Sequence, residues 1–309
     1  MVAAVIDRAP VVSVVMPVRN GMPYIDEAIR SICKQTFTDW ELVVVDDGST
    51  DGTASLLEQW MQADARIRVI RQDAQGLVAA SNAAVGAARG RYVARLDSDD
   101  IAHAKRLAWQ VACMERNPKL LAIGSAIQLF GDRSGLLFTP LTNWGCKGRL
   151  LFENCFAHSS VMLRYSMIEH FKPIYQAQTD FAEDLALWVR IAHLGSFANI
   201  PLPLVKYRVH PRQVSREQAK SLQKKHADFS VLQWRRLGVD VSAEDFQRFR
   251  WPNFLERGGL GVMTGSLRVM WAMRALLATR YAPQAAWWMA SIFARNMLKL
   301  VFPAARTHL

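Results

Sequence analysis

Cysteine is scarce in this sequence, and the few cysteines lie far apart. There are four among 309 residues, and no two of them form a C-x-x-C pair. This spacing argues against a disulfide framework of the kind that stabilises small secreted proteins. We therefore expect reduced, mostly buried thiols in a cytosolic protein, at Cys33, Cys113, Cys146 and Cys155.

Long apolar runs and two familiar nucleotide-binding patterns are also missing. No stretch reaches the ~18 uninterrupted apolar residues that indicate a transmembrane helix. Residues 1–10 have neither the basic head nor the apolar run of a signal peptide, so none is predicted. No G-x-G-x-x-G follows the first apolar run and no Walker A sequence is present, which argues against a Rossmann dinucleotide site and a P-loop.

Acidic residues are outnumbered by basic ones. The 38 lysines and arginines exceed the 27 acids, for a formal net charge of +11 and a pI near 9.8. This balance favours an anionic partner, such as nucleotide phosphates, nucleic acid or an anionic membrane face. With 51% hydrophobic residues, the chain can fill the core of one large domain, or of a domain plus an extension.

Short apolar runs alternate with amphipathic stretches over the first hundred residues. Strands are expected at residues 11–16, 41–45, 66–71 and 91–96, with helices at about 23–34, up to 61 and at 76–89 between them. Alternation of this kind predicts an α/β fold, with a mostly parallel sheet and helices on both of its faces.

Two of these strands end in clusters of acids. Because ligands bind at the carboxyl edge of open α/β sheets, these acids are candidate site residues. Crowded carboxylates need cations or donors, and Mg²⁺ or Mn²⁺ would suit them and could hold a diphosphate. The alternative is a solvated acidic turn that caps the next helix, with Asp100 at its start. The clusters contain Asp46 and Asp47 after the second strand, and Asp97, Ser98, Asp99 and Asp100 after the fourth.

The middle of the chain continues the mixture of strands and helices. Strands are expected at residues 120–129 and 160–163, with a loop or hairpin at 131–142. The stretch at 198–209 contains Pro201 and Pro203 and is therefore interpreted as an edge strand. Helices are expected at 105–116, 143–152, 179–194 and 217–237, the last with Leu222, Phe229 and Leu232 facing inward.

The expected helix at 179–194 carries a second pair of acids. Asp180 and Glu183 match a D-x-x-E capping pattern, which gives Glu183 a structural role. Asp184 has no such role and lies in the first turn, beside the apolar face formed by residues such as Leu185 and Trp188.

The composition changes from about residue 251. Glu256 is the only acid from there to residue 309, against seven bases, and Trp271, Trp287 and Trp288 stand among apolar residues. Two basic, Trp-rich helices would suit an interfacial membrane anchor. The alternative is a helical pair packed on the domain.

Four motifs occur in a characteristic order: PVRN after the first strand, VVVDDGSTDGT after the second, LDSDD after the fourth, and AED on a later helix. Together they resemble the inverting glycosyltransferases of family 2, which have a GT-A fold. The resemblance extends from about Val11 to Ser215. It implies a catalytic domain at residues 1–215 and a C-terminal helical extension at 216–309.

The resemblance also implies roles for individual residues. Asp184 would be the catalytic base, with Glu183 as the fallback, and His158 would lie near the metal and the acceptor. Asp99 would bind Mg²⁺ or Mn²⁺, helped by Asp97 and His210. The nucleotide would be held by Pro17, Val18, Asn20, Asp47, Asp97 and Ser98, while Asp46 would order its loop.

The activity so implied is transfer of a sugar from a UDP-, GDP- or dTDP-sugar to an acceptor hydroxyl. The acceptor would be a glycan or glycolipid in bacterial-type surface polysaccharide or lipid-linked glycan synthesis, at the cytoplasmic face of a membrane that the C-terminal helices contact. Two alternatives remain. A sugar nucleotidyltransferase would need a Gly-rich, basic loop after the first strand, where PVRNGMP is a poor match. A non-catalytic basic protein that binds membrane or nucleic acid fits the charge, but acids at strand ends would repel phosphate backbones, so no nucleic acid is expected.

Overall fold

The structure is a computed structural model, and it describes residues 9–179, 182–211, 213, 219–236 and 239–250. The predicted basic, Trp-rich helices beyond residue 250 lie outside the described residues, as do Asp180 and Ser215. Over the described residues no helix combines the length and the apolar character needed to cross a bilayer.

The first hundred residues form the predicted parallel half of the sheet. Apolar β-branched runs make its strands, which pair in parallel in the order β3-β2-β1-β4. Each crossover is a helix, as the alternating pattern predicted. The elements are β1 (Val12–Val18), α1 (Ile25–Cys33), β2 (Trp40–Asp47), α2 (Thr53–Ala63), β3 (Ile67–Gln72), α3 (Leu77–Gly86) and β4 (Tyr92–Arg95).

The second half adds strands of both directions to the same sheet. The full order is β3-β2-β1-β4-β8-β6-β9-β5, and β7 forms a hairpin with β6. Because β8 is antiparallel to both β4 and β6, and β9 is parallel to β6, the strands β4, β6 and β9 end at the same edge as β1. The strands are β5 (Ile101–Ala102), β6 (Leu120–Gly131), β7 (Gly135–Leu137), β8 (Met162–Arg164) and β9 (Ser196–Val209).

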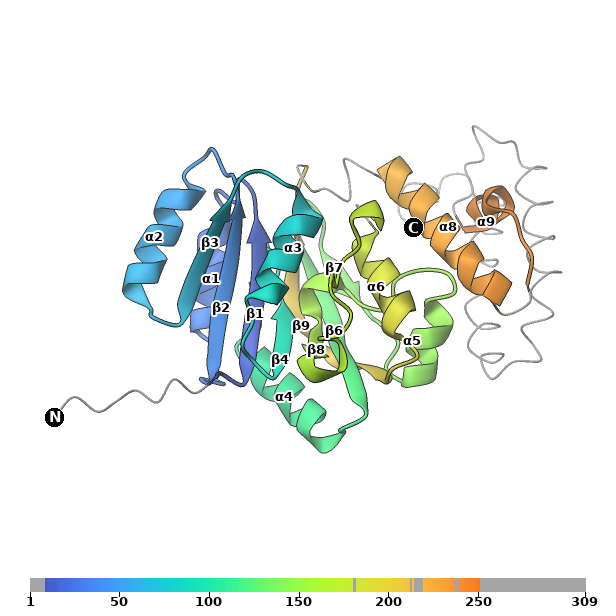
Figure 1. The fold of residues 1–309 in the computed structure, drawn as a ribbon, viewed down its shortest axis with the longest axis horizontal. Coiled ribbons are helices and arrows are strands. Elements are labelled where there is room, and N and C mark those ends of the chain that lie inside the picture. Colours follow the sequence, from blue (N-terminus) through green and yellow to red (C-terminus); the bar gives the residue numbers. More distant parts are fainter. Residues whose placement is uncertain (1–8, 180–181, 212, 214–218, 237–238, 251–309) are drawn as a thin grey trace.

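The remaining α-helices of the described residues are seen in Figure 1. They are α4 (Arg106–Arg116), α5 (Asn143–Arg149), α6 (Glu183–Ile191), α8 (Ala219–Arg236) and α9 (Ala243–Arg250), and the 3₁₀ turns are η1 (His158–Ser160), η2 (Tyr165–Met167) and η3 (Ala177–Thr179). The helices α4, α5 and α6 lie between strands of the second half, and α8 and α9 follow the last strand.

The prediction that residues 198–209 form an edge strand holds in part. β9 pairs with β6 along its length, while on its other side only Val205 and Lys206 pair, with the two-residue β5. Its prolines are accommodated because the register with β6 is irregular where they occur: Ile200 lies opposite Ser125, and Pro203 opposite Ala126. A bulge of this kind tolerates proline inside a sheet, since the ladder hydrogen bonds are already interrupted there.

Two apolar clusters cover the two faces of the sheet. Alternation along β1 sends Val14 and Met16 to the cluster that contains α1 and α4, and Val15 to the cluster that contains α3 and α6. In Figure 1, α3 lies in front of the sheet and α1 behind it. The carboxyl edge of the strands therefore belongs to a sheet that is packed on both faces.

The helix α8 packs against this unit through a different face from the one predicted. Leu232 is exposed, while Ala227, Val231 and Trp234 are buried. The indole of Trp234 lies edge-on to Phe152 and donates its N–H to the Leu151 carbonyl at 2.8 Å, and this contact sets the orientation of the helix. Phe229 is partly buried, as predicted, and the side chain of Leu222 lies outside the described residues.

The four cysteines are free thiols, as predicted. Cys146 and Cys155 are buried, but Cys33 and Cys113 are only half-buried, so the expectation of mostly buried thiols holds for two of the four.

Candidate active site

The predicted site residues come together at the carboxyl edge of the sheet. Pro17 and Val18 are the last residues of β1, and Asp47 is the last residue of β2. Residues 97–100 follow β4, with Ser98 in a turn, and His210 follows β9 directly. The topology explains the convergence, because these strands run in one direction and end at one edge.

Asn20 joins the loops that follow β1 and β2. Its backbone adopts a left-handed conformation at φ 53°, which asparagine tolerates better than most residues. Its N–H donates to the Ser49 hydroxyl at 2.9 Å, and its side-chain oxygen accepts the Thr50 N–H at 2.8 Å. Asp46 accepts the Ser49 N–H at 3.0 Å, so it orders its loop as predicted. The two loops therefore form one unit.

Asp47 is buried and organises the loop between β3 and α3. Its carboxylate accepts the Gln72 side-chain amide at 2.7 Å and the backbone N–H groups of Gln75 and Gly76 at 2.8 Å each. Burial alone would raise the pKa of Asp47, but these donors outweigh burial and lower the pKa. An ionised carboxylate is thereby fixed at the end of β2.

Asp97 is paired with a buried cation. The Arg95 Nε donates to Asp97 Oδ1 at 2.7 Å, and the same guanidinium donates to the Ser81 hydroxyl at 2.8 Å. The Asp97 N–H donates to the Ser159 hydroxyl at 2.9 Å. Burial alone would raise the pKa of Asp97, but the charge of Arg95 lowers it. Asp97 is therefore an ionised, tightly held carboxylate.

Asp99 lies against His210, with 3.0 Å between Oδ2 and the imidazole Nε2. Burial and the neighbouring Asp97 raise the pKa of Asp99, and His210 partly offsets them. A carboxylate and an imidazole from the chain suit a Mn²⁺ or Mg²⁺ ion whose other ligands are diphosphate oxygens and water. Among the described residues no three His, Cys, Asp or Glu side chains surround a common point, so the predicted set of Asp97, Asp99 and His210 is not assembled by the chain alone.

Asp100 is not the start of a helix, because α4 begins after Lys105. Its side chain is fully buried, and it accepts the backbone N–H of Arg208 at 2.9 Å. Burial, Asp99 and Asp97 all raise the pKa of Asp100 well above its usual value. Asp100 therefore joins the acidic turn to the end of β9.

Arg208 strengthens the same connection. Its Nε donates to the Asp99 carbonyl at 2.9 Å, and its guanidinium lies 4.4 Å from the ring centres of both Tyr24 and Phe130. It also forms an ion pair with Glu27 on α1. These contacts hold His210 beside Asp99.

The acids of α6 differ in their surroundings. The helix begins at Glu183 with Ala182 as its N-cap, so the predicted capping pattern is wrong. Glu183 is buried, and burial followed by the charge of Asp184 raises its pKa to about 7. Asp184 is half-buried, and its Oδ2 accepts the Asn154 side-chain amide at 2.8 Å. Asp184 is thus the accessible carboxylate, and Asn154 orients it.

His158 lies between the two groups of acids. Its Nε2 is 2.9 Å from the Tyr175 hydroxyl, and its ring packs edge-on against Trp188. Burial and then Arg95 lower the pKa of His158 to about 4, while Asp184 and Asp97 act in the opposite direction. The imidazole is therefore neutral near pH 7. It lies close to the acidic turn after β4 and to the first turn of α6.

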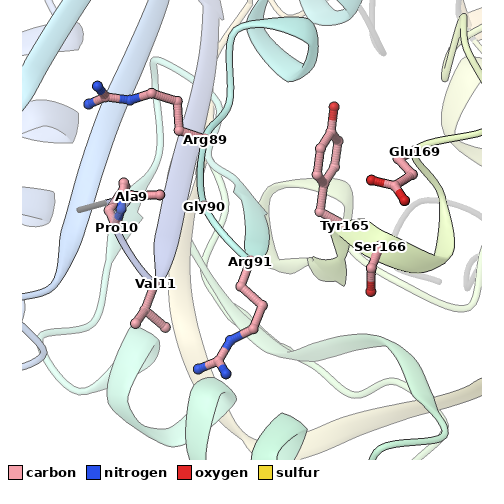
Figure 2. A pocket seen from close by; sticks show the side chains of 9 residues that line it. All are labelled: Ala9, Pro10, Val11, Arg89, Gly90, Arg91, Tyr165, Ser166 and Glu169. Atoms are coloured by element: carbon pink, nitrogen blue, oxygen red, sulfur yellow. The ribbon is translucent and has the colours of Figure 1, made fainter. Parts of the chain in front are cut away.

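A separate cavity of about 380 Å³ lies at the opposite edge of the sheet, where Val11 and Arg91 precede β1 and β4. The side chains of Arg89 and Arg91 point away from each other there, Arg89 to the left and Arg91 downward in Figure 2. Arg89 pairs with Glu41 at 3.0 Å and Arg91 with Glu115 at 2.5 Å, so both charges are paired with carboxylates that do not line the cavity. None of the predicted site residues lines it.

Solved structures show which fold this sheet and its helices form. The chain superposes on TarS 1–349 from S. aureus in complex with UDP-GlcNAc with a TM-score of 0.62 at 18% identity, covering 85% of this chain and 81% of TarS 1–349. It superposes on the mannosyltransferase PcManGT from Pyrobaculum calidifontis, in complex with GDP-Man and Mn²⁺, with a TM-score of 0.56 at 18% identity, covering 96% and 88% of the two chains. The fold is the GT-A fold of glycosyltransferases.

Sequence relatives define the family. Residues 13–153 match the family described as Glycosyl transferase family 2. An uncharacterised glycosyltransferase of Haemophilus influenzae is 31% identical over 254 residues, which cover 76% of this chain and 78% of the relative. The putative teichuronic acid biosynthesis glycosyltransferase TuaG of Bacillus subtilis is 31% identical over 221 residues, which cover 70% and 85%. The chain belongs to family 2 of the glycosyltransferases, as its motifs predicted.

Proposed function

We propose that this glycosyltransferase moves a sugar from a nucleoside-diphosphate sugar to an acceptor hydroxyl in a single displacement that inverts the anomeric centre. The observation that carries the proposal is the position of Asp184. This half-buried carboxylate is oriented by Asn154, and both it and Asp97 are close enough to His158 to raise the pKa of that imidazole. In this proposal Asp184 acts from the face of the sugar opposite the diphosphate, which Asp99 and His210 would approach through a bound ion.

In this mechanism the acceptor oxygen attacks the anomeric carbon while the bond from that carbon to the diphosphate oxygen breaks. Asp184 accepts the proton of the acceptor hydroxyl. The nucleoside diphosphate leaves with the bonding electron pair. Glu183 is the fallback base. Glu183 is buried, whereas Asp184 is half-buried and can be reached by an acceptor, which makes Asp184 the better candidate.

The nucleotide is assigned to the loops after β1 and β2 and to the acidic turn. Pro17, Val18 and Asn20 would line its pocket, Asp47 would face the base, and Asp97 and Ser98 would approach the ribose. Asp99 and His210 would hold a divalent ion, which when bound offsets the charge of the departing diphosphate. TarS and PcManGT were solved with UDP-GlcNAc and with GDP-Man and Mn²⁺, which supports a nucleotide-sugar donor and such an ion.

The acceptor is proposed to be a growing polysaccharide or a lipid-linked glycan. The name of TuaG refers to teichuronic acid biosynthesis, and a chondroitin synthase of Escherichia coli is 28% identical over 200 residues. Residues 1–215 would be the catalytic unit, and residues 216–309 an extension whose basic, Trp-rich part contacts the cytoplasmic face of a membrane.

Thermal stability with UDP, GDP or dTDP, each with and without Mn²⁺, tests the donor site, because a ligand that binds only the folded state raises its stability. We expect one nucleotide to raise the melting temperature, and to do so more strongly with the metal. Asp99→Ala should abolish the additional rise in melting temperature that the metal causes. Glu58→Ala, which removes an exposed acid paired with Arg71, is the matched control and should leave it unchanged. Failure of every nucleotide to stabilise the wild type would contradict the proposal.

A further inference from the structure

Large apolar side chains are concentrated on one exposed stretch of this surface. Over residues 136–144, five such side chains are between 40% and 64% exposed. The remaining exposed large apolar side chains of the described residues are scattered over separate elements, as is usual for a soluble surface. We call this stretch the apolar strip; it consists of Leu136, Leu137, Phe138, Leu141 and Trp144.

The strip is supported by the folded core. Leu137 lies opposite Ile127 in the β6–β7 pair, and the carbonyls of Pro140 and Leu141 accept hydrogen bonds from Asn199 at 2.7 and 3.3 Å. Trp144 is in the first turn of α5, whose N-cap hydroxyl, on Thr142, accepts the Gly145 N–H. These apolar side chains are therefore held outward by ordered backbone.

Basic residues outnumber acidic ones around the strip. Residues 132–153 contain three basic and two acidic residues, and one base, Arg149, pairs with Glu153 at 3.1 Å. The Arg149 guanidinium donates to the Phe138 carbonyl at 3.4 Å, and the Lys147 ammonium lies 6.0 Å from the centre of the Trp144 ring. Cations beside exposed aromatic and aliphatic side chains match the interface of an anionic bilayer, where rings enter the headgroup region and charges meet lipid phosphates.

The strip begins at the edge of the sheet that carries the active site. β6 ends with Phe130 and Gly131 opposite Arg208 and Val209, and the Asp132 N–H donates to the Val209 carbonyl at 2.8 Å. His210 is the next residue along β9. From there the strip runs toward the opposite edge, because the Leu141 carbonyl accepts the Asn199 N–H and the Asn143 side chain accepts the Phe197 N–H near the start of β9. A membrane in contact with the strip would therefore lie along β7 and α5, with only the β7 end close to the acidic turn.

We propose that the apolar strip docks on an anionic membrane surface, in addition to any contact that the C-terminal extension makes. The link to catalysis rests on the proposed function, because a lipid-linked acceptor would be reached from a membrane surface. The docking itself does not depend on it, since binding to lipid needs neither donor nor turnover.

The test is sedimentation of the full-length protein with vesicles of phosphatidylcholine, alone or with about one-third phosphatidylglycerol, without nucleotide. We expect the wild type to bind the anionic vesicles, and Leu137→Ser/Phe138→Ser to lower the vesicle partition coefficient about tenfold. Met61→Ser/Leu232→Ser removes two similarly exposed side chains on α2 and α8, and should bind as the wild type does. Trp144→Ser is a second, independent variant and should also weaken binding.

Equal binding by the wild type and the strip variants would overturn the proposal and leave the extension as the membrane contact. The proposal would also fail if the wild type were a dimer that the strip variants dissociate, since the strip would then bind a second copy. Unchanged melting temperatures would exclude unfolding of the variants. Donor-site failure would appear separately, as loss of nucleotide stabilisation with vesicle binding intact.

Discussion

The imidazole of His210 lies 3.0 Å from the carboxylate of Asp99, although 111 residues separate them in sequence. The contact joins the end of β9 to the turn after β4, so it connects the two halves of the sheet at the candidate active site. Arg208 supports it through the Asp99 carbonyl, and Asp100 through the Arg208 N–H. The geometry of the proposed metal site is therefore set by β9 as much as by the acidic turn.

Replacing His210 tests this connection. We expect His210→Ala to raise the Mn²⁺ concentration needed for half-maximal activity about tenfold or more, because one ligand of the proposed ion and the partner of Asp99 are both lost. The measurement is a Mn²⁺ titration of transfer activity at saturating donor. His170→Ala, which removes an imidazole whose side chain is 85% exposed, is the control and should titrate as the wild type does. Identical titrations for both variants would remove His210 from the metal site.

Asp184→Asn tests the proposed base. The amide is nearly isosteric but cannot accept the acceptor proton, so we expect kcat to fall about 100-fold to 10,000-fold. Nucleotide stabilisation should persist, because Asp184 does not contact the donor loops in this proposal. Asn154→Ala should have a smaller effect, since it removes only the hydrogen bond at 2.8 Å that orients Asp184. If Glu183→Gln abolished transfer while Asp184→Asn did not, Glu183 would be the base.

Glu183 predicts a pH dependence of stability. Its pKa is about 7 in the folded state, against 4.5 for the unperturbed group. The folded state therefore binds this proton more tightly, and the stabilisation is complete below pH 4.5 and is lost as the pH rises to about 7. Glu183→Gln should gain stability relative to the wild type over this window, by up to about 3 kcal/mol. Chemical denaturation of both proteins over about three pH units, from about 5 to 8, measures this gain. If the difference in the free energy of unfolding did not change with pH, the raised pKa of Glu183 would be contradicted.

Glu41 predicts a stability effect far from the site. Its buried carboxylate accepts hydrogen bonds from the Ser13 hydroxyl, from Arg68 and from the backbone and side chain of Arg89. Glu41→Gln places an amide donor among these donors, so we expect a loss of about 3 kcal/mol in the free energy of unfolding. Glu58→Gln, in an exposed pair with Arg71, should cost under about 1 kcal/mol. If both variants lost the same free energy of unfolding, the hydrogen bonds of the buried Glu41 carboxylate would not contribute more to stability than an exposed ion pair.

The parallel half of the sheet could be predicted from sequence because its signals are local. Apolar runs such as residues 41–45 and the acids that follow them mark strands and their carboxyl ends. The second half was harder to place. β9 was predicted to be an edge strand because of Pro201 and Pro203. Sequence did not show that β5 pairs with Val205 and Lys206, or that the register with β6 is irregular at the prolines.

The residues that orient the site were missed for a related reason. Asn154, Tyr175 and Ser159 contact Asp184, His158 and the Asp97 backbone from segments that carry no periodic pattern. Their roles depend on distances between segments far apart in sequence. The predicted capping by Asp180 and Glu183 failed because α6 begins at Glu183 itself. The D-x-x-E pattern is present in the sequence, but the helix begins three residues after Asp180, so the pattern does not cap it.

The strand order also determines when the site becomes complete during synthesis of the chain. β1 to β4 use only residues up to Arg95, so this half of the sheet can pair early as the chain leaves the ribosome. Asp99 and Asp100 lack their partners His210 and Arg208 at this stage, because those residues follow 111 and 108 residues later in the chain. Until β9 is added, the crowded carboxylates repel one another without these donors. Addition of β9 is thus a late assembly step, and a nascent chain that has not reached it lacks a finished catalytic edge.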